Sequence, residues 1–201
     1  MGLSRRDFAL LLAMTPGIGG RTVTRILARN DLLSRTPESF LKLSPEAMKE
    51  EYGVKLRSGE LLKECAKDPL SRVRPMQERL DKLGVGLITS ADAHYPERVE
   101  SMDPDPPGVL FLYGNAKLLE PKTFCVLSSR NTSRAGLDLM ERLSEEHVLS
   151  GEIAVAGHDT PEYQRSALVP LRWGAPRILC LDRGLFQALG ENLTEEPFRA
   201  A

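Results

Sequence analysis

A short polar loop, Ser128-Ser129-Arg130-Asn131-Thr132-Ser133, follows an apolar run and precedes a stretch with helical periodicity. Small hydroxyl residues in such a loop present N–H and O–H donors, and an arginine adds a planar fork that suits a phosphate. The positive end of the following helix dipole favours the same ligand. Ser128, Ser129, Arg130 and Ser133 are therefore candidate phosphate-binding residues. The alternative is a solvated loop in which Ser133 serves as the helix N-cap, and the two roles are compatible.

Gly157 and His158 follow the next apolar run and are the second candidates. Because ligands bind beyond the carboxyl ends of strands in an open α/β sheet, we expect these residues to face Ser129 and Arg130. The pair His158-Asp159 suggests catalysis or metal binding. The sequence offers no serine or cysteine nucleophile in a recognisable turn and no second cluster of ligands. We therefore expect no catalytic residue, no metal and no cofactor.

The third candidate is the segment Pro16-Gly17-Ile18-Gly19-Gly20-Arg21-Thr22, which lies between two helical stretches. In a helix-hairpin-helix, such a turn exposes backbone N–H groups at the start of the second helix, where they hold a phosphate without reading base sequence. Gly17, Gly19 and Arg21 are the expected contacts. A tight helix–helix connection that binds nothing is the alternative. A dinucleotide-binding loop is disfavoured because no strand precedes the turn.

The elements that position these candidates change in character along the chain. Residues up to 72 form short helical stretches, and Asp68-Pro69 indicates a domain junction. Short apolar runs then alternate with helical stretches, which is typical of βαβ units and a doubly wound, mostly parallel sheet. We predict a small all-helical domain of helix-hairpin-helix or SAM-like type over 1–72 and an α/β, Rossmann-like domain over 73–201. The helices are expected at 4–14, 21–30, 45–52, 58–68, 75–83, 133–148 and 163–173, and the strands at 85–89, 109–113, 124–127, 153–156 and 177–181.

Charge is distributed unevenly, although the formal net charge is only −1. Residues 1–72 hold 13 Lys and Arg against 9 Asp and Glu, whereas residues 73–201 hold 14 against 19. The basic first part suits a polyanion, and the acidic second part does not favour one. Neither part approaches the run of about 20 apolar residues that spans a membrane.

Cys65, Cys125 and Cys180 are scattered and odd in number, so the sequence contains no disulfide framework and no zinc motif. Cys125 and Cys180 lie in apolar runs and are expected in the core, as are Tyr163 and Trp173. We interpret the segment Asp92-Ala93-His94 as a solvated loop.

The N-terminal segment has an arginine pair, Arg5-Arg6, ahead of an apolar stretch of six residues that ends at Thr15-Pro16. This stretch is too short for an export signal, and no small-residue cleavage site follows. We therefore interpret it as a first helix capped by Ser4 and expect a cytosolic protein.

Further motifs occur in a fixed order along the chain. A helical front segment around Pro16–Gly20 comes first. The remaining matches are Tyr95-Pro96, Val99, Met102, Pro104, Pro106-Pro107, 109–111 and Gly114; then Val126 to Arg130, Ser133 and Gly136; then 151–157; and finally Ala167-Leu168, Gly174, Ile178, Leu181 and Gly184-Leu185. This ordered set resembles the DNA-processing protein A (DprA, or Smf) family and covers nearly the whole chain.

The resemblance implies a Rossmann-like domain that binds single-stranded DNA, forms a homodimer and helps to load a RecA-type recombinase during natural transformation, without being an enzyme. It further implies a C-terminal winged-helix domain, which we expect this chain to lack. The family's G-S-R loop corresponds to Ser128–Arg130 here, so a Cβ stands where glycine would let a phosphate approach the backbone. The loop after residue 157 is shortened, and Gln164 stands near the family's histidine.

Two alternatives follow from these departures. The shortened site would suit a single nucleotide, as in a nucleotide-binding Rossmann-like sensor, although the sequence has no PGGxGT motif. The second alternative is a scaffold that has lost DNA binding and keeps only a surface for oligomer or protein partners.

Overall fold

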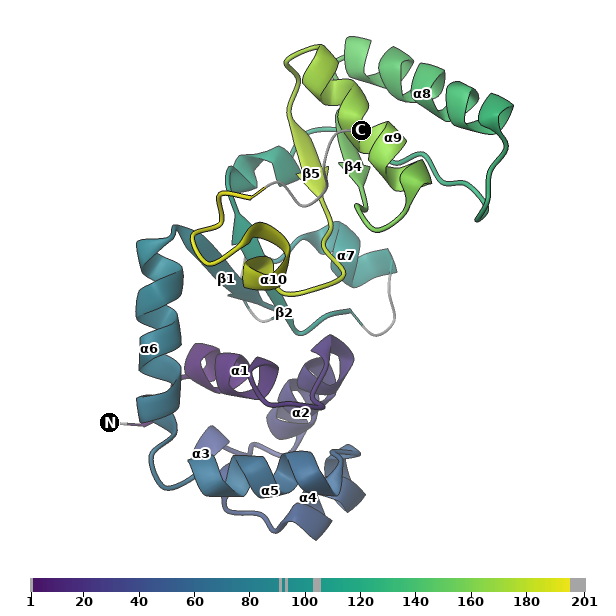
Figure 1. The fold of residues 1–201 in the computed structure, drawn as a ribbon. Helices are drawn as coiled ribbons and strands as arrows, with labels where there is room; N and C mark the ends of the chain where they lie inside the picture. The colour runs from purple at the N-terminus through teal and green to yellow at the C-terminus, as the bar shows by residue number, and fades with distance from the viewer. Residues whose placement is uncertain (1, 91, 93, 103–105, 196–201) are drawn as a thin grey trace. The chain divides into compact units, whose positions relative to one another are not determined.

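The computed structural model describes residues 2–90, 92, 94–102 and 106–195 (Figure 1). Along the chain two compact units are distinguished, with a division between Gly114 and Asn115. The first unit contains α1 (Arg5–Ala13), α2 (Gly20–Leu32), α3 (Pro37–Leu41), α4 (Pro45–Tyr52), α5 (Leu56–Cys65), α6 (Pro69–Lys82), β1 (Val85–Thr89), α7 (Glu97–Met102) and β2 (Val109–Tyr113). The second contains the 3-10 helix η1 (Ala116–Leu119), β3 (Thr123–Phe124), α8 (Arg134–Leu149), β4 (Ile153–Ala156), α9 (Pro161–Arg172), β5 (Arg177–Leu179) and α10 (Leu185–Leu189).

Side-chain caps fix the starts of several helices. Ser4 and Asp7 form a reciprocal capping box at α1, as expected for Ser4. Ser44 accepts a hydrogen bond from the Ala47 N–H at 3.2 Å, ahead of a proline at the first position of α4. Asp68 caps α6 in the same way. The Asp68-Pro69 pair is therefore a helix start, and the boundary predicted at 72/73 falls inside α6. The predicted domain boundary at 72/73 remains a prediction, whereas the two compact units of the structure divide after Gly114.

An aromatic cluster forms the centre of the helical part of the first unit. The ring of Phe40 meets those of Phe8 and Tyr52 edge to face, with centroids 5.4 and 4.8 Å apart. The Tyr52 hydroxyl donates to Asn30 Oδ1 at 2.7 Å and accepts from Arg35 at 2.6 Å. Its polar end is thereby satisfied inside the core.

Replacing Phe40 by alanine is expected to lower the free energy of unfolding by about 3–5 kcal/mol, since the ring is fully buried and two aromatic neighbours would lose their contact. Urea unfolding followed by far-UV circular dichroism measures the change. Leu32→Ala, at a side chain that is 84% exposed, is the control and should change the value by less than about 0.5 kcal/mol. Similar losses in both variants would contradict the assignment of Phe40 to the core.

Strands β1 and β2 pair antiparallel, with Val85 opposite Tyr113 and Thr89 opposite Val109. The prediction that they belong to a parallel sheet is therefore wrong. Val85, Leu87 and Thr89 are buried, while Gly86 between them is exposed. This alternation is typical of an antiparallel sheet with one covered face. The connection between the two strands runs over residues 90–108 and includes the six-residue α7.

The second unit has the parallel sheet that the sequence predicts, in the order β3-β4-β5. Helices α8 and α9 follow β3 and β4, lie side by side and pack on β4 (Figure 1). Ala156 and Ala167 meet in the small core between α9 and the sheet. The buried hydroxyls of Ser144 and Ser166 bond to one another at 2.8 Å, joining α8 to α9.

Three side chains expected in the core of this unit are exposed. Strand β3 ends at Phe124 and β5 at Leu179, so Cys125 and Cys180 lie just beyond the strands and are exposed. Trp173 follows the last residue of α9 and is half exposed, and its indole N–H donates to Glu145 Oε1 at 3.0 Å. Tyr163 is partly buried. The core predictions for the two cysteines and for Trp173 are therefore wrong, because the elements end earlier than their apolar runs.

Candidate nucleic-acid interface

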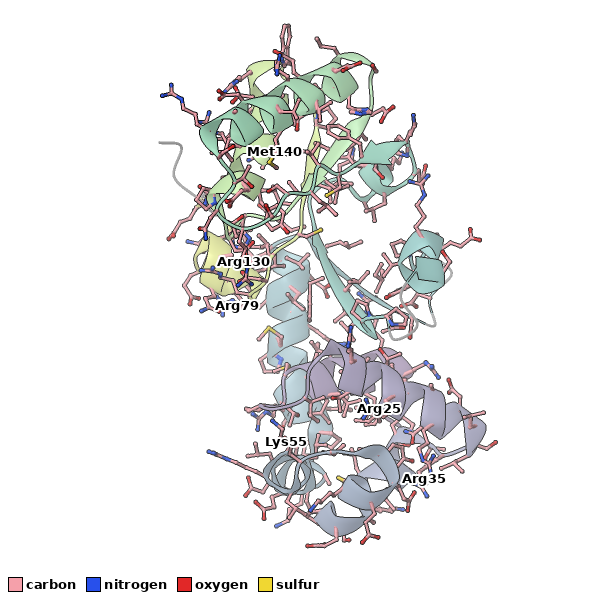
Figure 2. All side chains as sticks on the ribbon, turned by 90° about the vertical axis from the view of Figure 1, so that its right-hand side faces the viewer. Arg25, Arg35, Lys55, Arg79, Arg130 and Met140 are labelled. Atoms are coloured by element: carbon pink, nitrogen blue, oxygen red, sulfur yellow. The ribbon has the colours of Figure 1, made fainter. Side chains whose placement is uncertain are left out.

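The Ser128–Ser133 loop lies where the sequence predicts it, between the end of β3 and the start of α8. Ser129 and Arg130 are exposed and Ser128 is partly buried. Figure 2 shows the Arg130 side chain at the surface, and it has no ion-pair partner among the described residues. A guanidinium in this state is available to an anion in solution.

Local hydrogen bonds hold the loop in one conformation. The Thr132 hydroxyl donates to the Ser129 carbonyl oxygen at 2.6 Å, and Asn131 adopts a left-handed conformation with φ 59°. Ser133 accepts from the Gly136 N–H at 3.2 Å and is therefore the N-cap of α8, as predicted. A side chain at Gly136 would meet the Thr132 methyl group at 2.5 Å. The loop and the first turn of α8 therefore fit closely.

Glu162, in the first turn of α9, is a functional candidate that sequence reasoning missed. Its carboxylate accepts a hydrogen bond from the Thr132 backbone N–H at 3.2 Å, which ties the start of α9 to the loop before α8. Hydrogen bonds from the backbone N–H of Glu162 itself and, second in size, from that of Thr132 lower the pKa of this carboxyl. The only sequence signal is an acidic residue in the first turn after Thr160-Pro161, which is common at helix starts.

The Glu162 carboxylate thus accepts the hydrogen bond of the Thr132 backbone N–H, in the loop where we expect a phosphate to bind. Anions are stabilised near helix N-termini, and here the chain supplies one itself. Any phosphate approaching the Thr132 N–H meets a negative charge. This contact lowers the expected affinity of the loop for a polyanion.

Gly157 and His158 lie at the end of β4, as predicted, but the His158 side chain is buried, with 2% exposed. Its Nε2 atom is 3.4 Å from Asp182 Oδ1, and neither ring nitrogen has a hydrogen bond to a described residue. The His158 carbonyl oxygen accepts from Gln164 Nε2 at 2.9 Å. A hydrogen bond from the Arg183 side chain is the main cause that lowers the pKa of the Asp182 carboxyl. The imidazole thus faces the loop after β5, and its contact with a phosphate stays a prediction.

Gly157 is held close to α9. A Cβ at this position would lie 2.9 Å from Tyr163 Cδ2, so only glycine lets the strand end approach the ring. This contact is a structural reason for the glycine that does not depend on a ligand.

The turn between α1 and α2, which includes Gly17 and Gly19, belongs to the first unit. Gly17 has φ +84°, and the Ser58 hydroxyl donates to the Pro16 carbonyl oxygen at 2.8 Å. Gly19 is the N-cap of α2, which has no side-chain cap, and Gly19 has open space around it. Arg21 is exposed. The start of α2 therefore presents uncapped backbone N–H groups beside a cation, as the sequence predicts for this turn.

Replacing Gly17 by alanine is expected to lower the free energy of unfolding by about 1–2 kcal/mol, because an L-residue at this φ meets the following carbonyl oxygen. The added Cβ would also lie 2.7 Å from Ser58 Oγ. Gly19→Ser is the matched control: its φ of −95° suits serine, a preferred N-cap, so its stability should stay within about 0.5 kcal/mol of the parent. Equal stability of Gly17→Ala and the parent in urea unfolding would refute the turn assignment.

Asp92 has a structural role at the end of β1. Its carboxylate accepts from the Thr89 N–H at 2.6 Å and from the Thr89 hydroxyl at 2.9 Å. Ala93, like Pro104 of the motif that begins at Tyr95, lies outside the described residues. Among the residues that the structure describes, no group of three or more His, Cys, Asp or Glu side chains is placed to hold a metal. In the same ranges no helix is long and apolar enough to cross a membrane.

Comparisons with known proteins relate the chain to one family. Residues 86–159 match the family model described as DNA recombination-mediator protein A, and this range runs from the second residue of β1 through β2, the Ser128–Ser133 loop and α8 to the residues just after β4. No curated protein matches the chain. A solved structure with TM-score 0.62 and 16% identity is described as the X-ray structure of DNA processing protein A (DprA) from Streptococcus pneumoniae.

That structural similarity covers 92% of this chain and 60% of the other, so this chain spans less than two thirds of the length of that relative. At 16% identity the likeness concerns the fold, a mixture of helices and strands with a small parallel sheet. The family match confirms the resemblance predicted from the sequence motifs. Over residues 86–159, the chain is similar to the DNA recombination-mediator protein A family.

Proposed function

We propose that this chain is a non-enzymatic protein that binds the backbone of single-stranded DNA, in the manner of a recombination mediator. The observation that carries the proposal is the exposed Arg130, which pairs with no described acidic residue. It lies in a capped loop at the carboxyl edge of the parallel sheet, within the segment that matches the family. This edge is the usual ligand position of open α/β sheets.

The binding mode follows from the groups present. Arg130 would take two oxygens of one phosphate, and the hydroxyls of Ser129 and Ser133 and the N-terminus of α8 would add donors. None of these groups reads base edges, so we expect binding without sequence preference. The uncapped start of α2, with Gly19 and Arg21, would supply a second backbone contact.

The non-enzymatic character of the proposal is supported by the setting of His158. A catalytic histidine needs a nucleophile or substrate proton within hydrogen-bond reach. His158 is buried, and its ring nitrogens make no hydrogen bond to any described residue. We assign it a structural place between β4 and the loop after β5.

The remaining features of the proposal come from the family. They are a Rossmann-like architecture for the second unit, a helix-hairpin-helix for the turn between α1 and α2, a homodimer in the cytosol, and a RecA-type recombinase as partner in natural transformation. The family match concerns a DNA recombination mediator, and it supports the general role in DNA recombination from which these features are proposed.

Fluorescence anisotropy of a labelled poly-dT oligonucleotide, titrated with the full chain at two salt concentrations, tests the proposal. We expect saturable binding that weakens steeply with salt, because bound phosphates release counterions. A complete lack of binding at low salt would overturn the DNA-binding function. A mononucleotide that raises the melting temperature more than the oligonucleotide does would instead identify the chain as a nucleotide sensor.

A further inference from the structure

The helical part of the first unit, residues 2–82, carries an exposed row of arginines on α2. Arg21, Arg25 and Arg29 are four residues apart, so they lie on one face of the helix. The row points away from the core along about two turns of α2. The opposite face is buried through Val23, Ile26, Leu27 and Asn30.

No acidic side chain lies within this row. The chain has no Asp or Glu between Asp7 and Asp31. None of the three arginines forms an ion pair with a residue that the structure describes. Like charges one turn apart weaken a helix. The row therefore costs stability in the free protein, and an anionic ligand would remove that cost.

Lys55, which immediately precedes α5, adds a cation from a second segment. A Cβ at Gly17 would lie 3.9 Å from Lys55 Cδ, and a Cβ at Gly53 would lie 3.1 Å from Arg25 Nη1. The lysine thus lies beside the turn that starts α2, and Arg25 reaches the end of α4; both side chains are exposed (Figure 2). We define the α2 basic face as Arg21, Arg25, Arg29 and Lys55.

The acidic residues that border this face are engaged by other arginines. Asp31, in the last turn of α2, pairs with Arg5. Glu51, near the end of α4, pairs with Arg35 at 2.7 Å. These two carboxylates therefore do not neutralise the α2 basic face, which keeps its positive charge for a partner.

We propose that the α2 basic face binds the phosphate backbone of double-stranded DNA. Each of its four cations would neutralise one phosphate, and the uncapped N–H groups at the start of α2 would add donors at one end of the row. Of the single-strand contacts proposed above, only the start of α2 belongs to this face. The duplex site is therefore in the first unit, whereas Arg130 is in the second.

The aromatic side chains favour a duplex over a single strand. Proteins that hold single strands combine a basic groove with exposed rings on which the bases stack. The aromatic residues of 2–82 are Phe8, Phe40 and Tyr52, and each is at most 1% exposed. The helical part thus offers cations and backbone donors without a stacking surface. A duplex stacks its own bases and presents phosphates at a regular spacing, which these groups can hold.

Fluorescence anisotropy of a labelled blunt duplex of about 20 base pairs, titrated with the full chain at several salt concentrations, tests the proposal. We expect saturable binding at low salt. Log affinity should fall with log salt with a slope of about −3.6, because four phosphates release their counterions. A lack of duplex binding at low salt would overturn the proposal.

The double variant Arg25→Ala with Lys55→Ala locates the site. It should weaken duplex binding by at least about tenfold and make the salt slope shallower by about 1.8, the change expected for two phosphate contacts. Both side chains are exposed, and circular dichroism confirms that the variant is folded. An unchanged affinity and slope would overturn the assignment to the α2 basic face.

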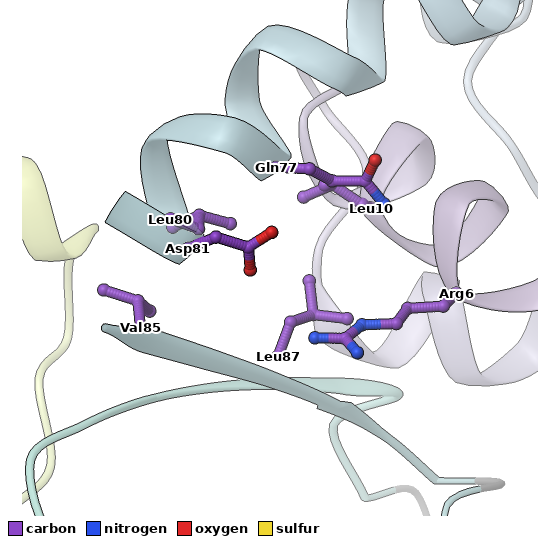
Figure 3. A pocket seen from close by; sticks show the side chains of 7 residues that line it. All are labelled: Arg6, Leu10, Gln77, Leu80, Asp81, Val85 and Leu87. Atoms are coloured by element: carbon purple, nitrogen blue, oxygen red, sulfur yellow. The ribbon is translucent and has the colours of Figure 1, made fainter. Parts of the chain in front are cut away.

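The matched control, Arg6→Ala with Lys82→Ala, also removes one arginine and one lysine. Both residues are exposed beside an acid: Arg6 shares the lining of a pocket with Asp81 (Figure 3), and Lys82 follows Asp81 on α6. The control should bind the duplex within about twofold of the parent. Equal losses in the two double variants would show that net charge alone attracts the DNA and would overturn the site.

The duplex and single-strand functions fail separately in these experiments. A parent chain that binds the duplex through the α2 basic face but does not bind poly-dT would support the duplex site and overturn the single-strand function alone. A parent chain that binds poly-dT but not the duplex would do the reverse.

Discussion

Replacing Arg130 by alanine should weaken the binding of poly-dT by about tenfold at low salt, since a charge-assisted contact to phosphate is lost. The dependence of log affinity on log salt should become shallower by about 0.7, the change expected for one phosphate contact on a single strand. The exposure of Arg130 predicts that the fold tolerates the change. Anisotropy titrations at several salt concentrations give both values.

Arg142→Ala is the matched control for this experiment. Arg142 is exposed on α8, in the same unit. Its replacement by alanine removes the same charge at a position outside the loop. Its affinity and salt dependence should stay near those of the parent. If Arg142→Ala and Arg130→Ala lose affinity equally, the binding arises from net charge and the loop is not the site.

Replacing Glu162 by glutamine should have the opposite effect and strengthen poly-dT binding by about fivefold at low salt, since a negative charge beside the loop is removed. The amide oxygen of glutamine can still accept from the Thr132 N–H, so the link between the loop and α9 is kept. The gain should shrink as salt rises, because screening weakens the repulsion that the parent carries. Anisotropy titrations with the same oligonucleotide measure the gain.

Glu146→Gln changes the net charge by the same amount from an exposed position on α8 and serves as the control. It should leave the affinity nearly unchanged. Equal affinities of Glu162→Gln and the parent, in a parent that binds through Arg130, would show that Glu162 does not compete with the DNA. Binding by Glu162→Gln alone would show that this carboxylate keeps the site closed in the parent.

The pKa of Glu162 implies a related pH dependence with a definite sign. Because the folded-state pKa is lowered, the carboxylate contributes stability that is present above its unfolded pKa and is lost as pH falls through the folded value. The repulsion of DNA follows the same charge. Both effects therefore persist throughout the neutral range.

Local signals predicted much of the framework. Ser4, Ser44 and Ser133 are helix caps in the structure, as their positions before helical periodicity indicate. The strand at 153–156 is found with the predicted bounds, and its neighbours pair with it in parallel. These features depend on a few adjacent residues, which is the range over which sequence patterns are informative.

The errors concern properties that depend on distant partners. The antiparallel direction of β2 relative to β1 has no local signal, because the apolar run Val109–Tyr113 is compatible with either direction. Cys125 is exposed because β3 ends one residue earlier. The contact of Glu162 with Thr132 joins residues thirty positions apart, and no local pattern marks it.

The Arg130 loop is anchored unequally at its two ends. Upstream, the short β3 pairs with β4 at Thr123 and Phe124, and the Ile153 N–H donates to the Lys122 carbonyl oxygen, whereas downstream the loop enters the sixteen-residue α8 through a capped first turn. Local opening costs least where few hydrogen bonds must break, so the strand side yields before the helix side. We therefore expect the residues between Phe124 and Ser129 to adapt to a bound polymer more readily than the hydrogen-bonded segment from Ser129 to Ser133.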